Sequence, residues 1–150
     1  MELNAAGGGI DLKLRLSLRE GTVYYFTHHS LTSPEPHYFI VVNSDPLTQK
    51  VLLLAVVTSQ IKTVKLRRKA CLDTLVEITP EVFDVLTKPS IVDCNDLKEV
   101  PLADFNARFV ANRIRYFDKD LPAALRKALR KAIHASIVLS DEQKAQVAKP

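Results

Sequence analysis

The sequence has no apolar run long enough to cross a bilayer. Its longest run, VLLLAVV at 51–57, is far shorter than the roughly 20 residues that a membrane-spanning helix needs. The opening residues, MELNAAGGG, have neither the basic start nor the apolar core of a secretory signal peptide. Together these absences predict a cytoplasmic protein without a membrane segment.

Cysteine is scarce, and its spacing does not suggest a metal site. Cys71 and Cys94 lie 23 residues apart, and the sequence contains no Cys-x-x-Cys or His-x-x-x-His pair from which a zinc site would start. The glycines at 7–9 precede a predicted strand, whereas a phosphate-binding loop leads into a helix. Acidic residues near Cys94 disfavour a thiolate, so we expect a structural cysteine. We therefore expect reduced thiols, no metal and no cofactor.

The composition is that of a globular domain, with 47% hydrophobic and 25% charged residues. A chain of 150 residues most simply forms one domain, which we place at 10–140 between a flexible leader (1–9) and a tail (141–150) that we expect to fray. The net charge of +4 is uneven, since residues 108–150 hold ten Lys/Arg against four Asp/Glu. This basic half indicates either an anionic partner or only a solvated helix face.

Strand patterns dominate the first two thirds of the chain. Residues 10–19, IDLKLRLSLR, alternate apolar and polar side chains, which predicts a half-buried strand. The segments YFIVV and VLLLAVV, joined by a turn, predict a long hairpin at the centre of the core. Three further segments are predicted as strands: 22–27, 73–79 and 89–95.

Helical patterns are concentrated in the last third. We expect a short capped helix at 79–86 and another short helix at 101–109. A C-terminal amphipathic helix is predicted at about 120–139, with Asp120 as a possible N-cap and apolar residues every four positions from Leu121 to Ile137. The fold class is therefore α+β, mainly β, built on a small curved sheet or barrel.

One cluster of polar residues has a plausible chemistry. His37 opens the first strand of the predicted hairpin, and Thr58 and Ser59 close the second, so antiparallel pairing brings them together. Histidine exchanges protons near neutral pH, and hydroxyl groups can bind phosphate oxygens. The alternative interpretation is that these residues are only the polar ends of two buried strands.

The order of motifs resembles the PemK/MazF-like toxin family. The segments that carry the resemblance, between Gly21 and Asp96, are GTVYYF, PHYFIVV, VLLLAVVTS and SIVDCND. The family's Thr-Ser pair falls on Thr58 and Ser59, and its Arg-Pro step falls on His37 and the following tyrosine. Of its Arg-Cys-Asp element only Cys94 is kept, while aspartate and asparagine stand at positions 93 and 95.

The resemblance implies an SH3-like barrel, a homodimer and a metal-independent endoribonuclease of a toxin–antitoxin pair. Such an enzyme cleaves single-stranded RNA through attack of the ribose 2′-hydroxyl and is neutralised by an antitoxin protein. His37 would transfer protons with help from His28, which can match a loop histidine of some family members. Thr58 and Ser59 would bind phosphate. Four cations would hold the RNA backbone: Lys62, Lys65, Arg67 and Arg68.

Two other interpretations remain open. The first is a non-catalytic SH3-like barrel that binds nucleic acid or a protein partner. The second is an interaction protein whose basic C-terminal helix docks on an acidic partner.

Overall fold

A six-stranded antiparallel sheet organises the chain in a computed structural model that describes residues 9–31 and 34–150. Its strands, in the order in which they neighbour one another, are β4 (Leu75–Ile78), β5 (Ser90–Pro101), β3 (Val51–Thr58), β2 (His37–Val41), β1 (Val23–Phe26) and β6 (Arg115–Phe117). The α+β prediction is confirmed. Within the described ranges no hydrogen-bonded pairing joins β4 to β6, so the sheet is open rather than closed into a barrel.

The predicted central hairpin is present. Strands β2 and β3 pair antiparallel, with Tyr38 opposite Val57 and Val41 opposite Leu54. A one-turn helix, α3 (Pro46–Gln49), lies in the connection, and the side chain of buried Asn43 bonds backbone groups of Val51 and Leu53 across the turn. A loop follows β1, and Thr32 and Ser33 within it lie outside the described residues.

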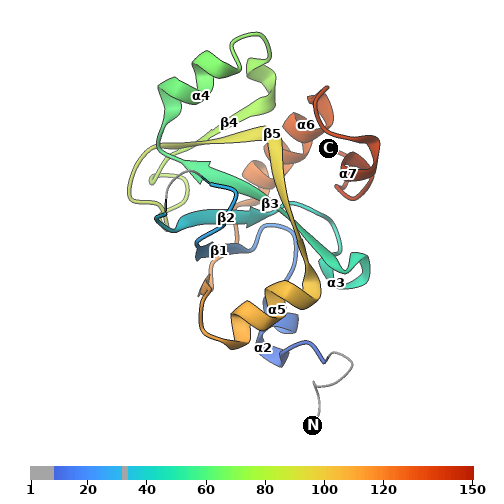
Figure 1. Cartoon of the computed structure of the whole chain (residues 1–150). Coiled ribbons are helices and arrows are strands. Elements are labelled where there is room, and N and C mark those ends of the chain that lie inside the picture. The colour runs from blue at the N-terminus through green and yellow to red at the C-terminus, as the bar shows by residue number, and fades with distance from the viewer. Residues whose placement is uncertain (1–8, 32–33) are drawn as a thin grey trace.

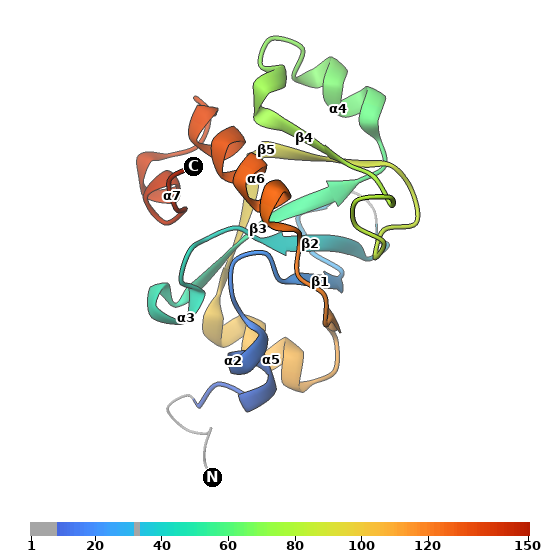
Figure 2. The same ribbon diagram turned by 180° about the vertical axis from the view of Figure 1, so that it is seen from behind.

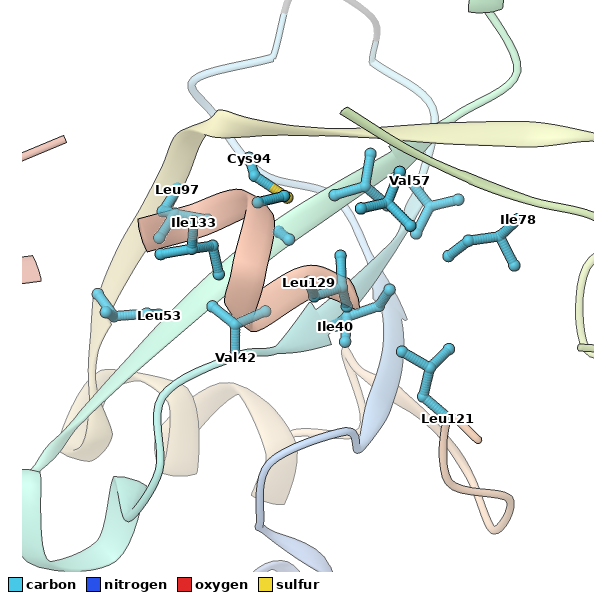
Figure 3. Close-up of a cluster of buried hydrophobic side chains, with 14 of the residues drawn as sticks. Ile40, Val42, Leu53, Val57, Ile78, Cys94, Leu97, Leu121, Leu129 and Ile133 are labelled. Atoms are coloured by element: carbon cyan, nitrogen blue, oxygen red, sulfur yellow. The ribbon is translucent and has the colours of Figure 1, made fainter. Parts of the chain in front are cut away.

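Each face of the sheet carries its own core. On one face, α6 (Ala123–Ala135) packs Leu129 and Ile133 against Ile40 and Leu53 (Figures 2 and 3). On the other face, α2 (Leu12–Ser17) and α5 (Leu102–Val110) lie side by side at the lower end of the sheet (Figure 1). The hairpin strands are apolar on both faces because both faces are covered.

The predicted strand at 10–19 is wrong, because this segment forms α2. The Asp11 side chain caps the helix by accepting from the backbone N–H of Leu14 at 3.2 Å. Leucine is a good helix former and lacks the branched Cβ that favours strands. Leu14 and Leu18 are buried at helical spacing, whereas Leu12 and Leu16 are exposed, so only part of the alternating pattern contributes to the core.

The helix predicted at 79–86 is also wrong. The chain turns there, and the backbone N–H groups of Val82 and Phe83 both donate to the Thr79 carbonyl. This turn buries both Phe83 and Leu86. The helix expected at 101–109 is confirmed as α5, whereas β5 extends to Pro101, well beyond the predicted strand end.

The C-terminal region is more ordered than the sequence indicated. Helix α6 ends at Ala135, which leaves Ile137 93% exposed instead of in the apolar stripe. The expected N-cap Asp120 instead forms an ion pair with Arg19. Residues 141–150, expected to fray, contain α7 (Asp141–Ala145), and Val147 is only 4% exposed.

The predicted leader at 1–9 lies outside the described residues except for Gly9. In the part of the chain that the structure describes, no helix is both long and apolar enough to cross a membrane.

Candidate functional site

A cavity of about 680 Å³ lies at the end of the sheet where β2 begins and β3 ends. The described residues that line it come from β1, the loop before β2, the two hairpin strands, the helix after β3, the turn before β5, and β5 itself. The helix after β3 is α4 (Ile61–Arg67), which forms from the basic stretch that sequence reasoning left unassigned. The elements around the cavity can be followed in Figure 1.

His37 stands at the mouth of this cavity, half-buried at the start of β2. Because Tyr38 is opposite Val57, His37 and Thr58 face each other at the open end of the hairpin. The Nδ1 atom of His37 lies 3.0 Å from the carbonyl oxygen of Glu35. A carbonyl can only accept, so Nδ1 carries the proton, and in the neutral ring Nε2 has a free lone pair. His37 can therefore accept a proton at Nε2.

Thr58 and Ser59 also line the cavity, as sequence reasoning predicted. The Thr58 hydroxyl oxygen accepts the backbone N–H of Gln60 at 3.2 Å, which leaves its hydrogen available to donate. Ser59 is exposed and immediately precedes the turn into α4. His37, Thr58 and Ser59 thus line the same cavity.

The predicted cations are only partly assembled around that cavity. Arg67 lines the cavity, while Lys62, Lys65 and Arg68 are not among the described residues that do. Lys62 is exposed on α4, and Lys65 forms a 2.7 Å ion pair with Glu77 of β4. Of the four predicted cations, Arg67 therefore lines the same cavity as His37, Thr58 and Ser59.

Asp93 of β5 offsets the charge of both arginines. Its Oδ2 atom lies 2.9 Å from Arg68 Nε and 3.6 Å from Arg67 Nη2. Its Oδ1 atom accepts from the backbone N–H and the side-chain amide of Asn95. Burial works to raise the pKa of Asp93, but the hydrogen bonds from Asn95 and Arg68 outweigh it and lower the pKa below its usual value. The carboxylate therefore stays charged and holds α4 against β5.

Asn95 extends this contact into a buried polar network that the sequence did not reveal. Its amide donates to Thr74 Oγ1 at 2.7 Å, and its carbonyl oxygen accepts the Ser136 hydroxyl at 2.6 Å. Cys94, between Asp93 and Asn95, is fully buried in the core (Figure 3). Burial, with a smaller contribution from Asp93, raises the pKa of the Cys94 thiol to about 12. Cys94 is therefore a structural residue.

His28 is placed apart from the proton-transfer position. It is not among the described residues that line the cavity, and its ring stacks on His29 with centroids 4.6 Å apart. Its Nδ1 atom lies 2.8 Å from the Ser30 hydroxyl. Burial, followed by the positive potential of His29, Lys98 and Arg108, lowers its pKa.

Three kinds of lining residue were not predicted from the sequence. Lys88 lies in the turn before β5 and adds a second cation to the cavity wall, and Tyr25 and Tyr38 add aromatic rings. Acidic side chains also line the cavity and oppose the two cations: Glu35, Asp93 and Asp96. Lys88 lies between the helix predicted at 79–86 and the strand predicted at 89–95, and both tyrosines lie in predicted strands, so no local pattern marks them as site residues.

No protein-family model matches the chain, and a search of curated proteins finds no match. Among the described residues, no group of three or more His, Cys, Asp or Glu is arranged to hold a metal ion.

Proposed function

We propose that this protein is a metal-independent endoribonuclease that cleaves single-stranded RNA through attack of the ribose 2′-hydroxyl. One observation carries the proposal. His37, with its Nδ1–H held by the Glu35 carbonyl, lines the same cavity as Thr58, Ser59 and Arg67. This reaction uses a base for the 2′-hydroxyl, and hydroxyl donors and a cation for the phosphate.

The reaction proceeds in one displacement at phosphorus. His37 Nε2 takes the proton of the 2′-hydroxyl, and the resulting oxygen attacks the adjacent phosphorus. The bond to the 5′-oxygen of the next nucleotide breaks, and that oxygen takes a proton from water at the open mouth of the cavity. The products are a 2′,3′-cyclic phosphate and a 5′-hydroxyl end. Thr58 and Ser59 donate to the non-bridging oxygens, and Arg67 offsets the charge that develops on them.

The relationship to PemK/MazF-like proteins belongs to the same proposal. In its support, the hairpin ending in Thr58 and Ser59 forms as the resemblance requires, and these residues line a cavity. The proposal includes an SH3-like arrangement of the strands, a homodimer, a cytoplasmic location and neutralisation by an antitoxin protein. Lys62 and Lys65 on the exposed side of α4 would hold RNA outside the cavity.

A second candidate function is RNA binding or protein binding without catalysis. The ion pairs of α4 favour it, because Asp93 and Glu77 compensate three of the four cations assigned to RNA. Compensated cations release fewer counterions when RNA binds, which weakens the electrostatic part of the affinity.

Cleavage assays on His37 variants separate the two functions. In EDTA, the wild-type protein should cleave part of a panel of single-stranded RNAs, and His37→Ala should lower the rate by about 10²- to 10⁴-fold, the usual contribution of a general base. His29→Ala is the matched control, because His29 is an exposed histidine that is not among the described lining residues. Intact RNA with salt-dependent binding would leave the second candidate, and RNA that is neither cleaved nor bound would remove both.

A further inference from the structure

Three half-buried aromatic rings form a continuous cluster beside the cavity, on the face of the sheet that carries α6. They are Tyr25 of β1, Tyr38 of β2 and Phe117 of β6, and we call them the aromatic platform. Tyr25 and Tyr38 are direct cross-strand partners with ring centroids 4.7 Å apart. Tyr38 also approaches Phe117, with centroids 5.6 Å apart. The platform therefore spans three neighbouring strands.

The platform differs from the aromatic residues on the other face. There, Phe26 and Phe39 stack with centroids 4.3 Å apart, and Phe105 of α5 packs edge-on against Phe26, so both rings are buried. Tyr38 and Phe117 also pack against the core, but all three platform residues are half-buried rather than buried. Isolated exposed apolar residues are common on surfaces, whereas a contiguous aromatic group beside a polar cavity is typical of a binding site.

The platform is continuous with the catalytic cavity. Tyr25 and Tyr38 line it together with His37, the residue that precedes Tyr38. Neighbouring strand residues point to opposite faces, so the cavity extends around the end of the sheet. A ligand whose phosphate lies between His37 and Thr58 therefore has the two tyrosine rings within the same cavity.

Positive charge borders the platform at the sheet edge. Arg115 is exposed, stands opposite Tyr25 in the β1–β6 register, and places its guanidinium carbon 4.8 Å from the Phe117 ring centroid. Aromatic rings flanked by arginine are the combination on which proteins stack unpaired bases and hold the connecting phosphates.

We propose that Tyr25 and Tyr38 stack the base next to the scissile phosphate, while Arg115 holds the following phosphate. This subsite rests on the proposed function in taking single-stranded RNA as the ligand. It selects unpaired RNA, because a base inside a duplex cannot reach the rings without unstacking. Stacking tolerates every base, so the platform contributes affinity and strand selectivity rather than a sequence motif.

A fluorescent, uncleavable RNA tests the platform directly. The probe is a random-sequence octamer that is 2′-O-methylated throughout and carries one 2-aminopurine; without a free 2′-hydroxyl it cannot undergo the proposed reaction. The protein contains no tryptophan, so the 2-aminopurine emission is read without interference. Binding should quench this emission. Tyr25→Leu and Tyr38→Leu should each weaken binding by about 5- to 100-fold and reduce the quenching.

Three further variants identify the cause of any loss of affinity for the octamer. Tyr38→Phe keeps the ring and should retain wild-type affinity, which shows that the ring rather than the hydroxyl group is required. Tyr116→Leu is the matched control, because Tyr116 is a half-buried tyrosine that packs on the opposite face of the sheet. Arg115→Gln should lower the slope of log affinity against log salt by about 0.7, the value for one phosphate contact on a single strand. The tyrosine variants should leave this slope unchanged.

The outcomes separate the platform from the nuclease activity. If Tyr25→Leu and Tyr38→Leu bind the octamer as well as wild type does, the platform is wrong, even if the protein cleaves RNA. If the wild-type protein binds no octamer, the platform is wrong as well. If wild type cleaves no RNA while both tyrosine variants lose affinity and quenching, the proposed stacking role of the platform is supported and the nuclease proposal is wrong.

Discussion

Replacing Asp93 by asparagine should destabilise the protein while keeping the shape of the side chain. The carboxylate is 9% exposed and accepts from Arg68 at 2.9 Å and from two Asn95 donors at 2.9 and 3.0 Å. Removing one partner of a buried ion pair costs about 3–5 kcal/mol. Arg68 keeps some contact with water, so we expect the lower end, about 3 kcal/mol. For a chain of this size that corresponds to a fall in Tm of about 6–12 °C.

The loss should also depend on pH in a defined direction. Burial opposes the charged form of Asp93, but the hydrogen bonds from Asn95 and Arg68 lower its pKa in the folded state. The folded protein therefore binds fewer protons than the unfolded chain in the acid range. The stability that Asp93 contributes is present above the unfolded pKa of about 3.9 and is lost as pH falls through the folded pKa.

Urea denaturation followed by circular dichroism at several pH values measures this effect. The difference in unfolding free energy between wild type and Asp93→Asn should be about 3 kcal/mol at pH 7 and should shrink progressively below about pH 5. Asp96→Asn is the matched control, because Asp96 is an exposed aspartate of the same strand, and its ion pair with Lys98 should contribute about 0–1 kcal/mol. A difference below 1 kcal/mol at pH 7, or one that is the same at pH 3, would refute the assigned role of Asp93.

Three other outcomes follow from the burial and charge of individual residues. Iodoacetamide at pH 8 should alkylate half-buried Cys71 in the folded protein and reach Cys94 only after unfolding, because Cys94 is fully buried with a pKa of about 12; equal rates would contradict this. An NMR titration should place the pKa of His28 below 6.5, because of its burial and the nearby cations, and Arg108→Gln should raise it. Ser140→Ala should cost about 1 kcal/mol and speed hydrogen exchange in α7 by removing its capping box, whereas unchanged exchange would show that the cap does not hold the helix.

The β-hairpin could be predicted because the residues that specify it lie in one contiguous segment of the sequence. Strand-forming residues on both sides of one connecting segment specify the pairing of β2 with β3, and extending the Tyr38–Val57 register by one residue places Thr58 opposite His37. Arg67 and Ser59 reach the cavity because α4 follows β3 directly. The central part of the candidate site therefore follows from one supersecondary unit.

The remaining differences between the predicted and the observed structure come from contacts between residues far apart in the sequence, which local patterns do not encode. The alternation of apolar and polar residues at 10–19 predicts a strand, yet leucine also favours helix, and as a helix the segment buries Leu14 against the sheet. The ion pairs of Asp93 join α4 to a strand 25 residues away in sequence. The tail at 141–150, which we expected to fray, is held in place by the burial of Val147 and by the bond from Ser44 N–H to the Gln146 carbonyl.

The chemical identity of the cleaved ends tests the central claim most directly. Single-stranded RNA incubated with the purified protein in EDTA should yield fragments that mass spectrometry identifies as 2′,3′-cyclic phosphates paired with 5′-hydroxyl ends. These fragments should disappear with His37→Ala and persist with His29→Ala. Fragments with 3′-hydroxyl and 5′-phosphate ends, or cyclic-phosphate fragments that form equally well without His37, would contradict the mechanism.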